Sequence, residues 1–184
     1  MRQTLIVALA ASVVSPAYGQ APAGERASFV TVLGRDTVVI ESFVRTPTRV
    51  EGDVVIRVPA TVRQHYVAER TNDGRFARSV LETIPLGAPE IPARKTSLVV
   101  DGDSLRITVD SGGQQLKETR PVSPDAVPLL VTGFNESFGL YGSLGLYEFF
   151  LTQLAAAREP PRDSLDVSSV AIATGRSATR RFVR

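Results

Sequence analysis

Few residues of this 184-residue chain are of a type that supports covalent or metal chemistry. His65 is its only histidine, and no G-x-S-x-G motif supplies the serine of a Ser-His-acid triad. The chain has no cysteine, so a zinc site would need three carboxylates beside this histidine, an uncommon ligand set. We therefore interpret His65 as a surface or sheet-lining residue, and we predict no metal site and no cofactor.

Paired carboxylates are the remaining route to catalysis. Glycosidases place two acidic side chains on either side of the bond that they hydrolyse. Glu41, Glu51 and Glu69 lie on or near predicted strands, but no motif distinguishes them from the other acidic residues. A carboxylate-dependent hydrolase is kept as an alternative function, and no catalytic residue is assigned.

Six of the twelve aromatic residues lie within seventeen positions, from 134 to 150. One interpretation is a helix that fills the core of a curved sheet; the other is an element that lines or covers an apolar pocket. Glycines at 139, 142 and 145 suit both a pliable lid and close packing. Val38, Ile40 and Ile107 are strand residues that we expect to face inward. The predicted ligand-binding residues are the six aromatic residues and two of these strand residues: Phe134, Phe138, Tyr141, Tyr147, Phe149, Phe150, Ile40 and Ile107.

The elements that would position these side chains are mostly short β-branched runs. Ser28–Leu33 and Thr37–Val44 are two of them, with a Gly-Arg-Asp turn between. Asn72-Asp73-Gly74 predicts a hairpin turn, because these residues tolerate a positive φ. Apolar and polar residues alternate over 105–110, which is typical of an antiparallel strand with one buried face. Strand patterns resume at 165–172 and 178–183.

One helix is predicted at about residues 143–158. Ser143 is a suitable N-cap, Pro160-Pro161 would end the helix, and apolar side chains on nearly every face predict burial. The expected fold is mainly β (α+β): a curved antiparallel sheet or half-barrel with one apolar helix packed on its concave face. Residues 20–184 would form this single strand-rich domain.

Residues 1–19 have the composition of a secretory signal peptide. Arg2 precedes an apolar run, and Ala17 and Gly19 place small residues at the −3 and −1 positions of a cleavage site. The ten-residue run would span about 15 Å as a helix, roughly half a bilayer core. We expect a periplasmic or secreted protein that begins at Gln20 and has no transmembrane segment. With 21 Lys and Arg against 19 Asp and Glu, the charge gives no reason to expect nucleic-acid binding.

A signal peptide, a curved antiparallel sheet and a late apolar helix together resemble the periplasmic lipoprotein-carrier family (the LolA and LolB architecture) and related exported domains. This resemblance implies a half-barrel that binds a lipid or acyl chain. LolB-like members are lipoproteins, whereas this chain has no cysteine to carry a lipid, and no site residue is carried over.

The leading hypothesis is therefore an exported carrier domain whose partner is a lipid or another apolar ligand. The alternative is a non-enzymatic structural or protein-interaction domain of the periplasm, with a filled core and a binding edge strand. A roomy apolar cavity would distinguish the first hypothesis from the second. The sequence does not predict an oligomeric state.

Overall fold

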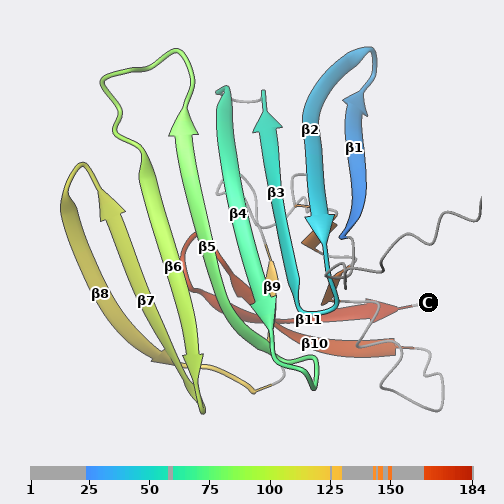
Figure 1. Cartoon of the computed structure of the whole chain (residues 1–184), viewed down its shortest axis with the longest axis vertical. Helices are drawn as coiled ribbons and strands as arrows, with labels where there is room; N and C mark the ends of the chain where they lie inside the picture. The colour runs from blue at the N-terminus through green and yellow to red at the C-terminus, as the bar shows by residue number, and fades with distance from the viewer. Residues whose placement is uncertain are drawn as a thin grey trace, which may run out of the picture.

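The computed structural model of the chain describes residues 24–57, 60–124, 126–129, 143, 145–146, 149–150 and 164–183. Eight antiparallel strands form one sheet in which each strand pairs with its neighbours in sequence, and the two outer strands do not pair with each other. The predicted mainly β, antiparallel architecture is thus confirmed, as an open sheet (Figure 1). Its strands are β1 (Glu25–Leu33), β2 (Asp36–Arg45), β3 (Arg49–Ile56), β4 (Val62–Arg70), β5 (Phe76–Pro85), β6 (Arg94–Asp101), β7 (Ser104–Ser111) and β8 (Gln114–Pro121).

The turns of this sheet follow the chemistry expected of hairpins. The predicted turn at Asn72-Asp73-Gly74 joins β4 to β5, with Gly74 at a φ of 88°. The backbone N–H of Thr71 donates to the Arg75 carbonyl and so closes this turn. Gly102 joins β6 to β7 at a φ of 63°, a conformation that glycine adopts without steric cost. Short hairpin turns of this kind explain why every strand lies beside the next one in sequence.

The two faces of the sheet differ sharply in burial. Along β3, Val50, Gly52, Val54 and Ile56 are buried, while the residues between them are partly exposed. We call the face that carries these four residues the inner face, and the opposite one the outer face. The inner face also carries Phe43, Tyr66 and Leu98 of other strands, each at most 3% exposed, so the hydrophobic core lies on this side.

A second, three-stranded sheet lies across the first. It is formed by β9 (Val127–Leu129), β10 (Ser164–Ala171) and β11 (Ser177–Val183), in the order β11-β10-β9. β10 and β11 form an antiparallel hairpin that crosses the strands of the large sheet (Figure 1), and β9 pairs parallel with β10.

The hairpin turn of the second sheet packs on the inner face. A Cβ added at Gly175 would collide with the Ile107 side chain of β7. Arg94 of β6 donates from Nη2 to the Ala173 carbonyl at 3.3 Å. Ile172 is fully buried in the same turn. The β6–β7 part of the inner face is therefore covered by the turn between β10 and β11.

The helix predicted over residues 143–158 is not shown as such, because the structure describes only positions 143, 145–146 and 149–150 of this range. Residues 145–146 and 149–150 are helical, and the other positions after Ser143 lie outside the described residues. The Ser143 hydroxyl accepts a 2.9 Å hydrogen bond from the Leu146 backbone N–H, the N-cap interaction expected of this serine. Within the described ranges, no helix has the length and hydrophobicity needed to cross a bilayer.

Candidate functional site

The predicted aromatic residues that the structure describes lie in the core. Phe149 and Phe150 are each 3% exposed and meet edge to face, with ring centroids 4.9 Å apart. Phe150 also packs edge to face against Phe76 of β5, at 6.2 Å. This described pair fills space on the inner face and leaves little of its surface open to a ligand. Four predicted positions lie outside the described residues: Phe134, Phe138, Tyr141 and Tyr147.

Of the two predicted strand residues, one faces inward and one does not. Ile107 is 4% exposed on the inner face, whereas Ile40 is 47% exposed on the outer face. The expected inward orientation of Ile40 is wrong because the register between β1 and β2 shifts next to Val38. This bulge adds one residue to β2, so the neighbouring residues Val38 and Val39 are both buried. After the bulge, Ile40 faces outward and Glu41 faces inward.

Glu41 is the centre of a buried polar cluster. Its carboxylate, 1% exposed, accepts a 2.7 Å hydrogen bond from the Tyr66 hydroxyl and another from the Ser143 hydroxyl, both at Oε1. Burial and the negative charge of Glu41 raise the pKa of Tyr66 far above its usual value of 10, so this phenol stays protonated. We call Glu41, Tyr66 and Ser143 the Glu41 cluster. It connects β2 and β4 to the first helical turn, at Leu146.

No motif in the sequence distinguishes Glu41 from the other acidic residues. The signal was present: Glu41 lies between Val39 and Phe43, in phase with two buried apolar residues. A carboxylate at such a position needs hydrogen-bond donors, because an unpaired buried charge is costly. Its donor Ser143 is 102 residues away in sequence, so no local pattern predicts the pair.

The three glutamates considered for catalysis lie on two opposite faces of the sheet. Glu41 is buried on the inner face, whereas Glu51 and Glu69 lie on the outer face and both accept hydrogen bonds from Arg49. Hydrogen bonds from Arg78 and Arg49 lower the pKa of Glu69, so it is ionised at neutral pH. A glycosidase acid needs the opposite shift, a raised pKa that keeps its proton.

The outer face of β3, β4 and β5 is covered by ion pairs. Arg78 and Arg49 both contact Glu69, and Arg63 contacts Asp53 at 2.9 Å. The imidazole of His65 lies among these groups, with Nδ1 3.5 Å from the Asp53 carboxylate. Within the described part of the chain, no group of three or more His, Asp or Glu residues is arranged to hold a metal ion.

At β1 and β2 the outer face exposes apolar side chains. Val30 is 60% exposed, Val32 54%, Ile40 47% and Val44 36%, and we call these four residues the β1–β2 patch. Val30 lies opposite Ile40 across the strand pair. The next residue in the same row is Val55 of β3, which lies opposite Ile40 on its other side. Val30, Val32 and Ile40 are thus neighbours on one end of the sheet, whereas Val44 lies further along β2, opposite Arg26 and Glu51.

The same end of the sheet carries an open strand edge. Among the described strands, β1 pairs only with β2, and its residues 27–33 include no charged side chain. The opposite edge strand, β8, carries Lys117, Glu118 and Arg120. Charged residues are the usual protection of an edge against pairing with another chain. β8 has this protection, and most of β1 does not.

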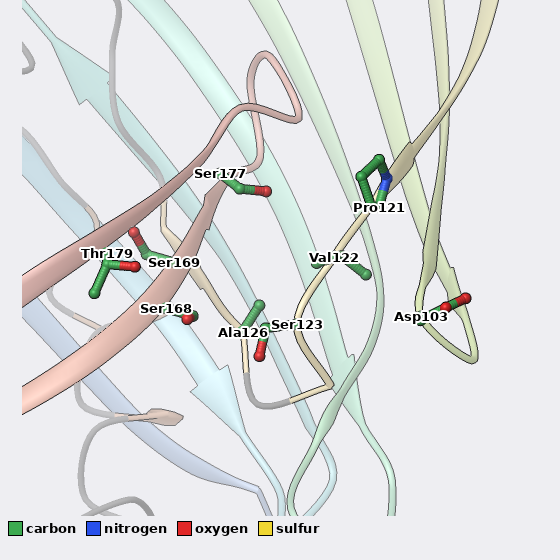
Figure 2. A pocket seen from close by; sticks show the side chains of 9 residues that line it. All are labelled: Asp103, Pro121, Val122, Ser123, Ala126, Ser168, Ser169, Ser177 and Thr179. Atoms are coloured by element: carbon green, nitrogen blue, oxygen red, sulfur yellow. The ribbon is translucent and has the colours of Figure 1, made fainter.

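A hydroxyl-lined cleft of about 370 Å³ lies between the second sheet and the part of the chain that holds the β6–β7 turn and the end of β8 (Figure 2). Figure 2 shows side chains from β10 and β11 facing the Ser123–Ala126 segment and the turn that holds Asp103. Side-chain oxygens lie among walls that are more apolar than polar in exposed surface. Its lining residues are Asp103, Pro121, Val122, Ser123, Ala126, Ser168, Ser169, Ser177 and Thr179.

The chain matches no protein-family model, and no curated protein or solved structure matches it significantly.

Proposed function

We propose that the chain is a protein-interaction domain whose docking surface is the open edge of β1 together with the β1–β2 patch. The observation that supports this proposal is that two features coincide. The most exposed apolar side chains of β1 and β2 lie beside a strand edge whose residues 27–33 are uncharged. The rest of the outer face, over β3 to β5, is occupied by ion pairs. Exposed apolar groups that form one patch commonly mark interaction sites.

The backbone chemistry of β1 defines what docks there. A strand with a neighbour on one side leaves N–H and C=O groups free along its other side. An added antiparallel strand satisfies these groups with main-chain hydrogen bonds. The outward side chains of that strand then lie beside Val30 and Val32, where apolar contact adds to the hydrogen bonds.

The occupant that we propose is a second copy of this chain. A β1 strand can pair antiparallel with its own copy about a two-fold axis, the commonest symmetry of protein dimers. Because residues 27–33 are uncharged, no like charges face each other over this stretch. Val30 and Val32 of both copies then form one continuous apolar row. Pairing of β1 with the charged β8 edge would instead place Lys117 and Glu118 beside an apolar strand.

Val30→Lys is expected to weaken this self-association at least about tenfold, because it places a charged ammonium group in the apolar row that Val30 and Val32 of both copies form. Val30 is 60% exposed, so the substitution leaves the fold intact. Sedimentation velocity over a range of protein concentrations measures the dimerisation constant. Leu116→Lys is the matched control: Leu116 is 64% exposed on the other edge strand, and its replacement should leave the constant unchanged.

Two results would contradict the proposal. One is a wild-type chain that stays monomeric up to about 100 μM, the other is an equal loss of association in Leu116→Lys and Val30→Lys.

A second candidate function, an exported carrier of a lipid or acyl chain, is supported by the open sheet and by the way the aromatic pair is held. The Arg70 guanidinium lies 4.0 Å from the centroid of the Phe149 ring and donates from Nη1 to the Phe149 carbonyl at 2.9 Å. Arg70 also donates to the Pro47 carbonyl, so one side chain fastens the helical residues to the rim of the sheet. In this proposal, release of Phe149 and Phe150 opens a half-barrel to an apolar ligand.

Mass spectrometry of the protein purified from the periplasm of its host tests this candidate. If the signal peptide is removed after Gly19, the denatured mass corresponds to a chain that begins at Gln20. A bound lipid appears as an excess native mass that organic solvent removes. A native mass equal to the denatured mass would count against a retained ligand, and a mass that includes residues 1–19 would count against export.

A further inference from the structure

The hydroxyl-lined cleft combines a mainly apolar surface with several hydroxyl groups, as a site for an uncharged ligand with both kinds of group would. Six of its nine lining residues carry a side-chain oxygen. Hydroxyl groups both donate and accept hydrogen bonds, whereas a carboxylate accepts them. These oxygens come from separate parts of the chain: the β6–β7 turn, the segment after β8, and the strands β10 and β11. The folding of the two sheets against each other brings them together.

The charge of the cleft restricts the class of ligand. Among the described residues that line it, Asp103 alone is charged, and no lysine or arginine is present. A phosphate or a carboxylate would therefore meet a like charge without a compensating cation. A neutral ligand with several hydroxyl groups avoids this repulsion and can bond to both the donors and the acceptors of the walls.

The floor of the cleft is apolar, and a backbone hydrogen bond holds it in position. Val122 and Ala126 are 6% and 4% exposed, and Pro121 lies beside them. The Val122 backbone N–H donates to the Asp103 carbonyl at 2.8 Å, so the floor and the Asp103 turn are joined. The Ser104 hydroxyl donates to Asp103 Oδ1 at 3.2 Å. An apolar floor below a polar rim matches the alternating C–H and O–H groups of a sugar ring.

We propose that this cleft binds a neutral saccharide of one or two rings. The Asp103 carboxylate accepts hydrogen bonds from sugar hydroxyls, and Ser168, Ser177 and Thr179 bond to further hydroxyls from the opposite wall. The ring packs its C–H face on Val122 and Ala126. The volume of about 370 Å³ falls within the range of about 300–1,000 Å³ that is usual for small-molecule sites. The site is separate from the β1 edge and does not depend on the function proposed for that edge.

The test is a titration of the ¹⁵N-labelled chain, followed by two-dimensional NMR, with four neutral disaccharides as probes: maltose, cellobiose, lactose and N,N′-diacetylchitobiose. At least one is expected to bind in the millimolar range, with shifts concentrated at residues 103–104, 121–126, 168–169 and 177–179. Glucuronic acid and glucosamine are the charged comparisons. Glucuronic acid should not bind, because its carboxylate faces Asp103.

The affinities of variants distinguish a specific binding site from weak contact of the sugar with the surface. Asp103→Asn is expected to weaken binding about fivefold to tenfold through loss of a charged acceptor, and Ser168→Ala about threefold to fivefold. Asp101→Asn is the matched control, since Asp101 belongs to the same turn, pairs with Arg106 at 3.0 Å and does not line the cleft. It should leave the affinity unchanged. Melting temperatures verify that all three variants are folded.

Three outcomes would overturn the proposal. The first is the absence of binding by all four disaccharides up to about 50 mM. The second is binding of glucosamine alone, which would identify Asp103 as a site for a cation. The third is an equal loss of affinity in Asp101→Asn and Asp103→Asn, which would show a non-specific response of the turn.

Discussion

Replacing Glu41 with alanine is expected to lower the free energy of unfolding by about 3–5 kcal/mol, because it removes the acceptor of a fully buried polar cluster. The hydroxyls of Tyr66 and Ser143 would both lose their bond to Oε1, and a cavity would replace the carboxylate. Urea denaturation followed by circular dichroism measures the change. For a chain of this size the melting temperature should fall by about 10 °C.

Glu51→Ala is the control for this substitution. Glu51 lies on the next strand, but its side chain is 45% exposed on the outer face, and loss of its ion pair should cost less than about 1 kcal/mol. Glu41→Gln keeps an oxygen for Tyr66 and Ser143 and should fall between the two. If Glu41→Ala cost no more than Glu51→Ala, the Glu41 cluster would not stabilise the fold.

The second large effect is expected at Gly52, where any side chain would enter occupied space. A Cβ at this position would lie 2.6 Å from the Tyr66 hydroxyl oxygen and 2.8 Å from Phe43 Cβ. Gly52→Val is expected to lower the free energy of unfolding by about 3 kcal/mol, because neither neighbour can move without leaving the core. The same denaturation experiment measures it.

The neighbouring Asp53→Val is the control, since Asp53 points to the outer face and is 42% exposed. It should change the stability by less than about 1 kcal/mol. Tyr66→Ala removes the aromatic ring that the new valine would strike, so Gly52→Val should be less harmful in that background. Strictly additive effects of the two substitutions would show that the clash with Tyr66 is not the cause.

The antiparallel sheet was predictable because its signals are local. Runs of β-branched residues, and turns such as Asn72-Asp73-Gly74, determine each hairpin within about twenty residues of chain. The strand patterns at 165–172 and 178–183 also correspond to β10 and β11. That these strands form a separate sheet across the first one was not predicted, because it depends on contacts such as that between Gly175 and Ile107.

The functional features were less predictable, and each for a physical reason. Ile40 was assigned to the wrong face because one inserted residue reverses the alternation of a strand, and no sequence signal marks that insertion. The hydroxyl-lined cleft draws on serines and a threonine between positions 123 and 179. Serine and threonine are common on exposed strands, so their meeting in one cleft follows only from the crossing of the two sheets.

The neighbour-by-neighbour order of the large sheet has a kinetic consequence. β1 to β8 form a simple meander, so each new strand can add to one already in place at a small cost in chain entropy. The hydrogen bonds that Ser143 donates to Glu41 and Arg70 donates to the Phe149 carbonyl close loops of 102 and 79 residues. Contacts between residues so far apart in sequence form late, after the strands of the large sheet have paired. During synthesis the growing chain therefore exposes its inner face until residues 143–150 and the last hairpin have emerged, and in that interval it is most prone to aggregate.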